Sequence, residues 1–316
     1  KKVSYSPAGK LFSIAFHALR VDSNKLLMDQ YQLRQFTGIR QIALRQQTAE
    51  GNRPQSIGLF GDAVFTMDSA ALVKKKIKTT QIESPSIVSR PDNRGNRAGT
   101  WPNLPGTGQE IIAIKSLFEK NKLSTALYRK TDASEEQLKA ISGQSPAVLH
   151  IATHGFFLPE PELISKETIT NSENSYTLAE DPLLRSGLIL AGGNYAWSGK
   201  TPIEGVEDGI VTAYEISQLN LSNTELVVLS ACETALGDVK GSEGVFGLQR
   251  AFKMAGVKKL IVSLWQVPDK ETAELMTAFY GYWLGGKKIE DAFSQAQTDM
   301  RKKYPPYYWA AFVLVE

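Results

Sequence analysis

The sequence is poor in the residues that build disulfides and metal centres. It contains a single cysteine, Cys232, so no disulfide can form within the chain and no zinc site with several cysteines is available. Histidine is equally scarce, with three residues among 316. No run of acidic residues suggests a calcium site. We therefore expect neither a metal nor another cofactor, and any nucleophilic chemistry has few candidate side chains.

Long apolar runs and a surplus of one charge are also lacking. No stretch approaches the roughly 20 apolar residues that cross a membrane as a helix, and the polar residues 1–10 are not followed by the apolar core of a signal peptide. Lysine and arginine number 36 against 33 aspartates and glutamates, a balance that disfavours nucleic acid and membranes as partners. We expect a cytoplasmic globular protein and, because the chain begins at Lys1, a fragment of a longer one.

Turn residues divide the chain into two regions. Residues 10–16 and 31–36 alternate apolar and polar side chains between turn residues, which predicts an N-terminal antiparallel β region over residues 1–52, packed on the core. Residues 53–316 form the second region, and its composition predicts one α/β domain. Within it, residues 156–205 are rich in Pro, Ser, Asn and Gly and are expected to form a long insertion loop.

Apolar segments of two kinds alternate along the second region. Short continuous apolar runs predict buried strands at residues 57–60, 125–128, 147–152, 226–231, 260–265 and 309–315. Helical spacing of apolar residues predicts helices at residues 107–119, 134–141, 210–219, 244–256, 271–284 and 289–302. Such alternation is typical of a mostly parallel sheet covered by helices on both faces. The basic segment 74–105, rich in Pro, Gly and Asn, is expected to be an exposed connection.

Two reactive side chains follow predicted strands. His154 follows the strand at 147–152 and Cys232 follows the strand at 226–231, and functional groups gather at the carboxyl ends of parallel strands. A thiol attacks as its thiolate, so it needs a base nearby and N–H donors for the oxyanion that forms. His154 fits the base, and the backbone N–H groups of Gly155 and Cys232 fit the donors. By themselves, however, a lone cysteine after an apolar strand is more often a small core residue and such a histidine a hydrogen-bonded loop residue.

Seven segments, taken in their order and spacing, favour the catalytic interpretation of His154 and Cys232 over the structural one. They are 104–110 (LPGTGQE), 150–157 (HIATHGFF), 207–216 (EDGIVTAYEI), 226–234 (LVVLSACET), 241–252 (GSEGVFGLQRAF), 263–269 (SLWQVPD) and 307–314 (YYWAAFVL). Together they closely resemble the CHAT domain, a caspase-like peptidase domain that is commonly attached to tetratricopeptide repeats. The resemblance covers nearly the whole chain.

The resemblance implies both a fold and a mechanism. The fold would be the caspase-like three-layer α/β sandwich. His154 of the ATHG motif would be the general base, Cys232 of the SACET motif the nucleophile, and Gly155 would line the oxyanion hole. The reaction would be peptide-bond hydrolysis through a thioester, without a cofactor. The family also implies a regulatory role, in bacterial signalling, with a tetratricopeptide-repeat region upstream or on a separate chain.

The segment from Trp265 to Asp269 bears on the substrate. It is similar to a tryptophan–valine–aspartate motif of separases, distant relatives in which the acid receives an arginine side chain. Asp269 would then favour a basic residue just before the scissile bond, the P1 position, through charge-assisted hydrogen bonds. The alternative is that Asp269 caps the helix that follows it.

Other polar residues are better explained by structure. We expect His150 to be a core histidine, because it lies within an apolar strand, and His17 to be structural. Asp208 precedes a predicted helix and is interpreted as its N-cap, with a role in orienting His154 as the alternative. The Ser/Thr/Asn-rich residues 165–177 are expected to form a loop that could act as a lid or a site of self-cleavage.

Two further functions remain open. The fold could serve as a catalytically silent signalling or scaffold module, although both residues of the dyad are present. The same thioester could also serve an acyltransferase or ligase, whose products would be joined to an amine instead of released to water.

Overall fold

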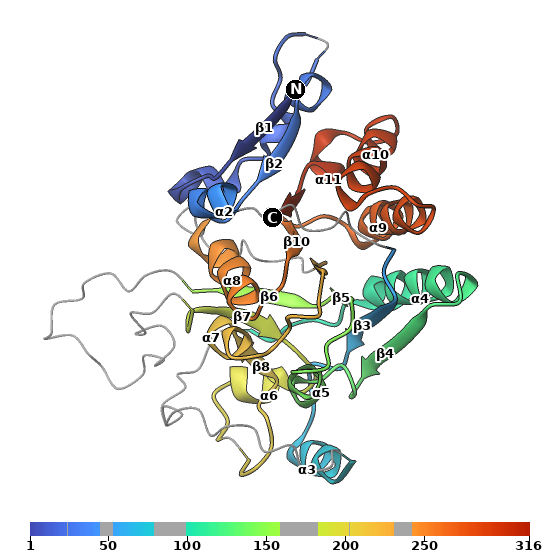
Figure 1. Ribbon diagram of the computed structural model, residues 1–316. Helices are drawn as coiled ribbons and strands as arrows, with labels where there is room; N and C mark the ends of the chain where they lie inside the picture. The colour runs from blue at the N-terminus through green and yellow to red at the C-terminus, as the bar shows by residue number, and fades with distance from the viewer. Residues whose placement is uncertain (24, 45–52, 79–98, 159–182, 202, 231–241) are drawn as a thin grey trace, which may run out of the picture.

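An eight-stranded sheet organises the computed structural model, which describes residues 1–316 except 24, 45–52, 79–98, 159–182, 202 and 231–241 (Figure 1). The strand order is β1-β2-β11-β10-β9-β5-β3-β4. Its strands are β1 (Lys2–Tyr5), β2 (Gln32–Gln35), β3 (Ser56–Ala63), β4 (Ser124–Lys130), β5 (Val148–Ile151), β9 (Leu226–Leu229), β10 (Lys259–Ser263) and β11 (Phe312–Val315). A second, three-stranded sheet contains β6 (His154–Phe157), β7 (Ser186–Ile189) and β8 (Ile210–Thr212).

The helices lie between these strands in the chain. They are α1 (Leu27–Gln30), α2 (Ile39–Leu44), α3 (Ser69–Lys78), α4 (Pro105–Lys120), α5 (Glu135–Ala140), α6 (Gly193–Trp197), α7 (Ala213–Ser217), α8 (Ser242–Met254), α9 (Asp269–Leu284), α10 (Ile289–Arg301) and α11 (Pro306–Trp309), with the 3₁₀ helices η1 (Gly9–Ser13) and η2 (Phe16–Ala18). Most of the strands and helices predicted for residues 53–316 are present within a few residues of the expected bounds.

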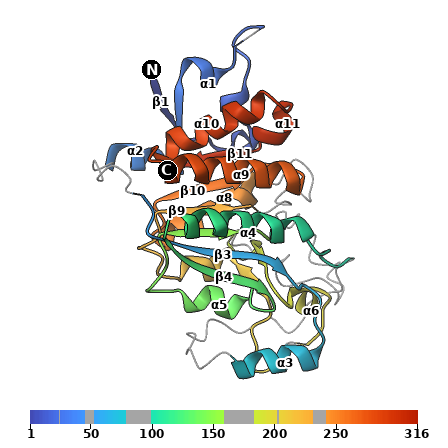
Figure 2. The same ribbon diagram turned by 90° about the vertical axis from the view of Figure 1, so that its right-hand side faces the viewer.

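Helices cover both faces of the large sheet. Helices α4, α9 and α10 lie on one face, and α5, α7 and α8 lie on the other (Figures 1 and 2). The strand β9 shows the reason, because Val228 packs with the first group of helices and Val227 with the second. Every residue of β5 and β9 is buried, as expected for strands covered on both sides. The predicted three-layer α/β sandwich with a mostly parallel central sheet is confirmed.

Strand direction reverses at one end of the sheet. Strands β4, β3, β5, β9 and β10 run parallel, whereas β11 is antiparallel to β10. Strand β2 runs parallel to β11, and β1 runs parallel to β2. The prediction of antiparallel pairing in the N-terminal region is therefore wrong. The connection between β1 and β2 contains η1, η2 and α1, so it is long enough to return the chain to the same end of the sheet. The division of the chain at residues 52 and 53 stays a prediction.

Three local expectations also differ from the structure. Residues 10–16 do not form a strand, because residues 9–13 form η1, with Phe12 buried and Leu11 exposed. The expected insertion loop at 156–205 contains β7 and α6, while its residues 159–182 lie outside the described part of the chain. The segment 74–105 is not a wholly exposed connection, since it begins within α3 and its Trp101 is buried.

The predicted helix at 210–219 is divided in two. Residues 210–212 pair with β7 as the strand β8, and α7 begins only at Ala213. The N-cap is Thr212, whose hydroxyl accepts the N–H of Glu215 while the Glu215 carboxylate accepts the N–H of Thr212. Asp208 is thus not an N-cap, and its carboxylate instead accepts the N–H of Ile210 at 2.7 Å. Sheet pairing has overridden the helical pattern here.

Within the described ranges, no helix is both long enough and apolar enough to cross a membrane. The same residues contain no group of three or more His, Cys, Asp or Glu side chains arranged to hold a metal ion.

Candidate active site

The strands that lead to the two predicted catalytic residues are neighbours. Strands β5 and β9 pair in parallel, with Ile151 opposite Leu229. His154 and Cys232 each follow their paired residue by three positions. A dyad of His154 and Cys232 requires these two strands to be adjacent, and the structure pairs them directly. Cys232 itself lies outside the described residues, so the contact between thiol and imidazole stays a prediction.

The imidazole of His154 is held in one orientation by its surroundings. Its side chain is 1% exposed, and its Nε2 lies 2.7 Å from the carbonyl oxygen of Pro102. A carbonyl can only accept, so Nε2 carries the proton and Nδ1 carries the lone pair of the neutral ring. The rings of Trp101 and Phe65 each lie 4.9 Å from the imidazole, measured between ring centroids. The geometry thus favours Nδ1 as the basic nitrogen.

The backbone of Gly155 faces away from its neighbouring strand. In the antiparallel pair β6–β7, Leu158 donates its N–H to the carbonyl of Arg185 at 2.7 Å, and His154 lies opposite Ile189. Hydrogen-bonded pairs alternate along such a ladder, so they fall at residues 158, 156 and 154. The N–H of Gly155 therefore points away from β7, and β6 is an edge strand of its sheet. This orientation is compatible with the predicted oxyanion donor.

Asp269 lies at the junction of two helices. It is the first residue of α9, but its Oδ2 accepts the N–H of Gly106, in the first turn of α4, at 3.0 Å. The alternative interpretation, that Asp269 caps its own helix, is therefore wrong, because its carboxylate caps α4 instead. A Cβ on Gly106 would lie 2.2 Å from the Asp269 Cβ, so glycine is needed for this approach. Burial, aided by the nearby charge of Glu110, raises the pKa of Asp269, while the Gly106 hydrogen bond and the proximity of His154 oppose the rise.

A buried polar network lies beneath this site. Ser230, just after β9, donates to Glu110 Oε2 at 3.0 Å, and His150 Nε2 lies 3.1 Å from Glu110 Oε1. The other ring nitrogen, Nδ1, lies 3.2 Å from the Tyr280 hydroxyl, within hydrogen-bond distance. Burial and the charge of Glu110 hold the pKa of Tyr280 well above its usual range. His150 is 0% exposed, which confirms its interpretation as a core histidine.

Four residues of the site had no predicted role from the sequence: Glu110, Trp101, Pro102 and Tyr280. A signal existed for Glu110, because it lies on the apolar face of α4, one residue before Ile111 and four before Ile114. An acidic residue in an apolar stripe indicates a buried polar partner. No comparable signal marked Pro102, whose contribution is a backbone carbonyl.

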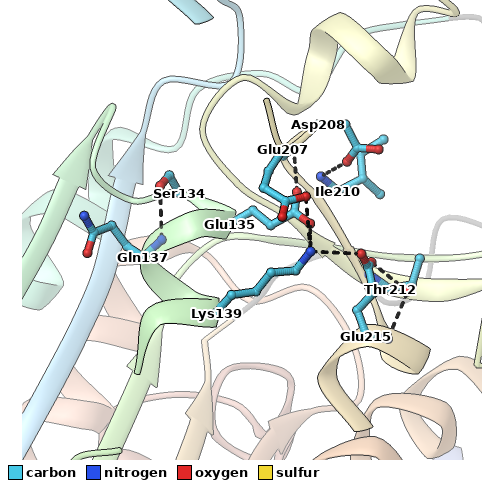
Figure 3. Close-up of polar contacts among 10 residues, drawn as sticks. Ser134, Glu135, Gln137, Lys139, Glu207, Asp208, Ile210, Thr212 and Glu215 are labelled. Carbon is cyan, nitrogen blue, oxygen red and sulfur yellow. Dashed lines mark hydrogen bonds and ion pairs between the residues drawn. The ribbon is translucent and has the colours of Figure 1, made fainter. Parts of the chain in front are cut away.

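Asp208 belongs to a second charged cluster, shown in Figure 3. The ammonium of Lys139 lies 2.7 Å from Glu135 and 3.2 Å from both Glu207 and Glu215. Glu135 is 1% exposed and also accepts the N–H of Gly209 at 2.9 Å. Its burial, with Asp208 and Glu215 nearby, raises its pKa well above the usual range. The alternative role of Asp208, orienting His154, stays a prediction.

Fold and site define an α/β protein whose central parallel strands lead to a histidine and a cysteine. A model of the CHAT domain family matches residues 1–316. The chain belongs to the CHAT domain family.

Relatives with curated names are tetratricopeptide-repeat proteins. Tetratricopeptide repeat protein 28 of Homo sapiens is 24% identical over 318 residues, which covers 97% of this chain and 12% of that protein. Its Mus musculus counterpart is 26% identical over 225 residues, covering 68% of this chain and 9% of that protein. The chain thus spans about a tenth of the length of these relatives.

Two solved structures match this chain over most of its length at low sequence identity. One is the Arg specific cysteine proteinase gingipain R, with a TM-score of 0.46, 10% identity, and coverage of 90% of this chain and 54% of that one. The other is the Saccharomyces cerevisiae separase–securin complex, with a TM-score of 0.41, 11% identity, and coverage of 90% and 13%.

Proposed function

We propose that this chain is a regulatory cysteine endopeptidase that uses His154 and Cys232 as a catalytic dyad. Nδ1 of His154 takes the thiol proton of Cys232, and the thiolate attacks the substrate carbonyl. The N–H groups of Gly155 and Cys232 stabilise the oxyanion. The imidazolium then gives its proton to the departing amine, which leaves a thioester on Cys232. A water molecule, deprotonated by His154, hydrolyses the thioester and releases the acid.

One observation carries this proposal. Ile151 and Leu229 lie opposite each other in the adjacent parallel strands β5 and β9. His154 and Cys232 each follow their member of this pair by three residues. Neighbouring strands are about 4.8 Å apart, so equal offsets at the same edge favour contact between two side chains that are distant in the sequence. The fixed Nε2–H tautomer of His154 supports the same assignment, because it leaves the lone pair on Nδ1.

We further propose that Asp269 receives a basic P1 side chain. Its carboxylate is half-buried, is close enough to His154 to be influenced by its charge, and has a raised pKa. A carboxylate in such surroundings gains from a cation, and a guanidinium offers charge-assisted hydrogen bonds. Gly106 donates to Oδ2, and Oδ1 is the oxygen that we propose accepts a hydrogen bond from the ligand.

The test is cleavage of fluorogenic peptides that carry Arg, Lys, Asp, Met or Leu at P1. We expect cleavage after Arg and Lys, with no detectable cleavage by Cys232→Ala or His154→Ala. For Asp269→Asn we expect kcat/KM on Arg substrates to fall about 10- to 100-fold, because one charge-assisted contact is lost. Activity that persists in a folded Cys232→Ala variant would exclude the dyad. An unchanged P1 preference in Asp269→Asn would exclude the pocket alone.

The burial of His154 favours a second candidate, the catalytically silent signalling or scaffold module. With 1% of its side chain exposed, the base does not face solvent in this structure. The two candidates differ in the reactivity of Cys232 toward an electrophilic peptide, such as an acyloxymethyl ketone with Arg at P1. Labelling of Cys232 in this chain combined with a tetratricopeptide-repeat region, dependent on His154, supports the peptidase. A thiol that stays unlabelled there while the protein binds its partners supports the silent module.

The named relatives support a regulatory partner. Both are tetratricopeptide-repeat proteins, and the chain matches only about a tenth of each. We propose that a region of this repeat type, in the same protein or on another chain, controls access to the site.

A further inference from the structure

The side chain of Asn194 joins two segments that surround His154. Asn194 lies in α6 and is 3% exposed. Its Oδ1 accepts the N–H of Trp101 at 2.8 Å, and its Nδ2 donates to the carbonyl of Trp101 at 2.9 Å. Nδ2 also donates to the hydroxyl of Thr66 at 2.8 Å, and the backbone N–H of Asn194 donates to the carbonyl of Phe65 at 3.0 Å. Since a backbone N–H only donates and a carbonyl only accepts, the orientation of this amide is unambiguous.

The segments held in this way are irregular. Residues 64–68 and 99–104 belong to no helix or strand, so they lack the regular hydrogen-bond ladder of a strand. Val64 is tied to other backbone groups at both of its own, donating to the Lys130 carbonyl at 3.2 Å and accepting the N–H of Gly192 at 3.0 Å. Asn194 pairs with Trp101 in the manner of a strand, satisfying both its N–H and its carbonyl. Loss of this side chain would leave both groups buried without that partner, which is costly enough to move the segment.

These two segments supply the surroundings of the imidazole. Phe65 and Trp101 contribute the rings at 4.9 Å, and Pro102 contributes the carbonyl that accepts Nε2–H. Pro102 directly follows Trp101, so a displacement of Trp101 moves the carbonyl as well. The aromatic rings stabilise a positively charged imidazolium, the form that exists after the thiol has lost its proton.

We infer that Asn194 is a positioning residue for His154, holding Trp101 and Pro102 so that the imidazole keeps one tautomer and one orientation. Its catalytic meaning rests on the proposed peptidase function. Its effect on the imidazole does not, and can be measured in a protein without activity.

The first experiment is ¹⁵N NMR of the histidines in the 316-residue chain. His154 is assigned by comparison with His154→Gln. We expect the neutral wild-type ring to be almost entirely the Nε2–H tautomer. In Asn194→Ala we expect a mixture of tautomers and a shifted His154 pKa, because the Pro102 carbonyl is displaced. Asn194→Asp keeps the acceptor for the Trp101 N–H and loses the donors, so it serves as a milder variant if the alanine variant does not fold.

Gln297→Ala is the matched control. Gln297 is a buried amide, 4% exposed, that donates to the carbonyls of Trp309 and Phe312 at 3.1 and 2.9 Å. Its loss also leaves backbone groups without a partner. In the described part of the chain its hydrogen bonds go to Trp309, Phe312 and His17, and none of these lies in the segments around His154. We expect its His154 signals to match the wild type. Unchanged signals in folded Asn194→Ala and Asn194→Asp, or equal changes in the control, would overturn the inference.

Trp101→Leu separates the ring from the carbonyl. This variant keeps the backbone bonds to Asn194, so we expect the tautomer to be retained. Loss of the aromatic face should lower the His154 pKa by about half a pH unit. A scrambled tautomer in this variant would show that the ring, and not the Asn194-held backbone, orients the imidazole, and would overturn the inference.

Kinetics distinguish this inference from the proposed function. If the chain cleaves peptides, Asn194→Ala should lower kcat about 10- to 100-fold, because the base is misplaced. KM should change little, because the proposed P1-binding residue Asp269 is not affected. A change of tautomer in a chain that never cleaves would support the positioning role and contradict the peptidase. If Asn194→Ala cleaves peptides and its His154 signals match the wild type, the peptidase is supported and the positioning role is contradicted.

Discussion

At the scale of single residues, the Glu110 carboxylate is the least expected group in the interior. It is 1% exposed, and burying a charge is costly unless hydrogen bonds or an opposite charge compensate for it. Ser230 donates a hydrogen bond to this carboxylate, His150 Nε2 lies 3.1 Å from its other oxygen, and the Tyr280 hydroxyl lies 3.2 Å from His150 Nδ1. The network connects α4, β5, β9 and α9. These are the elements that lead to His154, Cys232 and Asp269, so its rigidity bears on the site.

Removing members of this network should lower the free energy of unfolding to different extents. For Tyr280→Phe we expect a loss of about 1 kcal/mol, the usual value of one neutral hydrogen bond. For Glu110→Ala we expect about 3 kcal/mol, because His150 and Ser230 lose their common partner in the interior. Urea denaturation monitored by circular dichroism measures both. Equal stability of Tyr280→Phe and the wild type would contradict the assigned hydrogen bond.

At the scale of elements, ion pairs of Lys139 connect the helices α5 and α7. Lys139 of α5 is surrounded by carboxylates from its own helix, from the segment before β8, and from α7 (Figure 3). The three donors of one ammonium match three carboxylates. These charges raise the pKa of Lys139 above its usual range, even though burial opposes the rise. The ammonium therefore remains charged at neutral pH and offsets the repulsion among the acids.

Lys139→Met should lower the free energy of unfolding at pH 7 by about 3 to 5 kcal/mol, because it leaves buried carboxylates without a cation. The pKa of Glu135 is already raised in the folded state, and the variant should raise it further. A raised folded-state pKa disfavours folding as the pH increases above the unfolded value, so the penalty should be smaller at pH 5 than at pH 7. Urea denaturation at both pH values measures it.

Lys115→Met is the control for this prediction. Lys115 pairs with Glu119 on the surface of α4, and such an exposed pair contributes about 0.5 kcal/mol or less. A penalty for Lys139→Met that is as small as this, or that does not depend on pH, would show that the cluster is not held together by the ammonium.

At the scale of the whole molecule, the sheet has a strong centre and a weak end. The strands β5 and β9 are fully buried and paired over four residues on both sides. By contrast, β2 pairs with β11 only at Gln35 and Val315. Arg34 strengthens this junction, since its Nε lies 3.5 Å from Glu316 and its Nη2 lies 4.0 Å from Glu290.

Hydrogen exchange should follow this difference. We expect the amides of β1 and β2 to exchange faster than those of β5, β9 and β10, because they open without unfolding the central sheet. Arg34→Ala should accelerate exchange in β1 and β2 and leave the central strands unchanged. Peptide-level mass spectrometry resolves the two groups. Simultaneous exchange of all these strands would contradict a weak end.

Much of the fold was predictable because its signals are local. Apolar runs and helical spacing identified most strands and helices of residues 53–316, since burial on one or both faces imposes these periods on the sequence itself. The wrong predictions concern segments whose secondary structure or strand direction depends on partners distant in the chain. Residues 210–212 became a strand because β7 pairs with them, and β1 and β2 run parallel because a long connection allows it.

Local sequence patterns were enough to predict the three-layer class, the family, and the position of His154 and Cys232 after two apolar strands. Those features depend on composition, spacing and motif, which are properties of short segments. Other features emerge only in the folded chain: the pairing of β5 with β9, the capping of α4 by Asp269, and the contacts of Pro102 with the imidazole and of Asn194 with Trp101. Each of these contacts joins residues far apart in the chain, and several use backbone atoms that every residue possesses, so no side-chain pattern could reveal them.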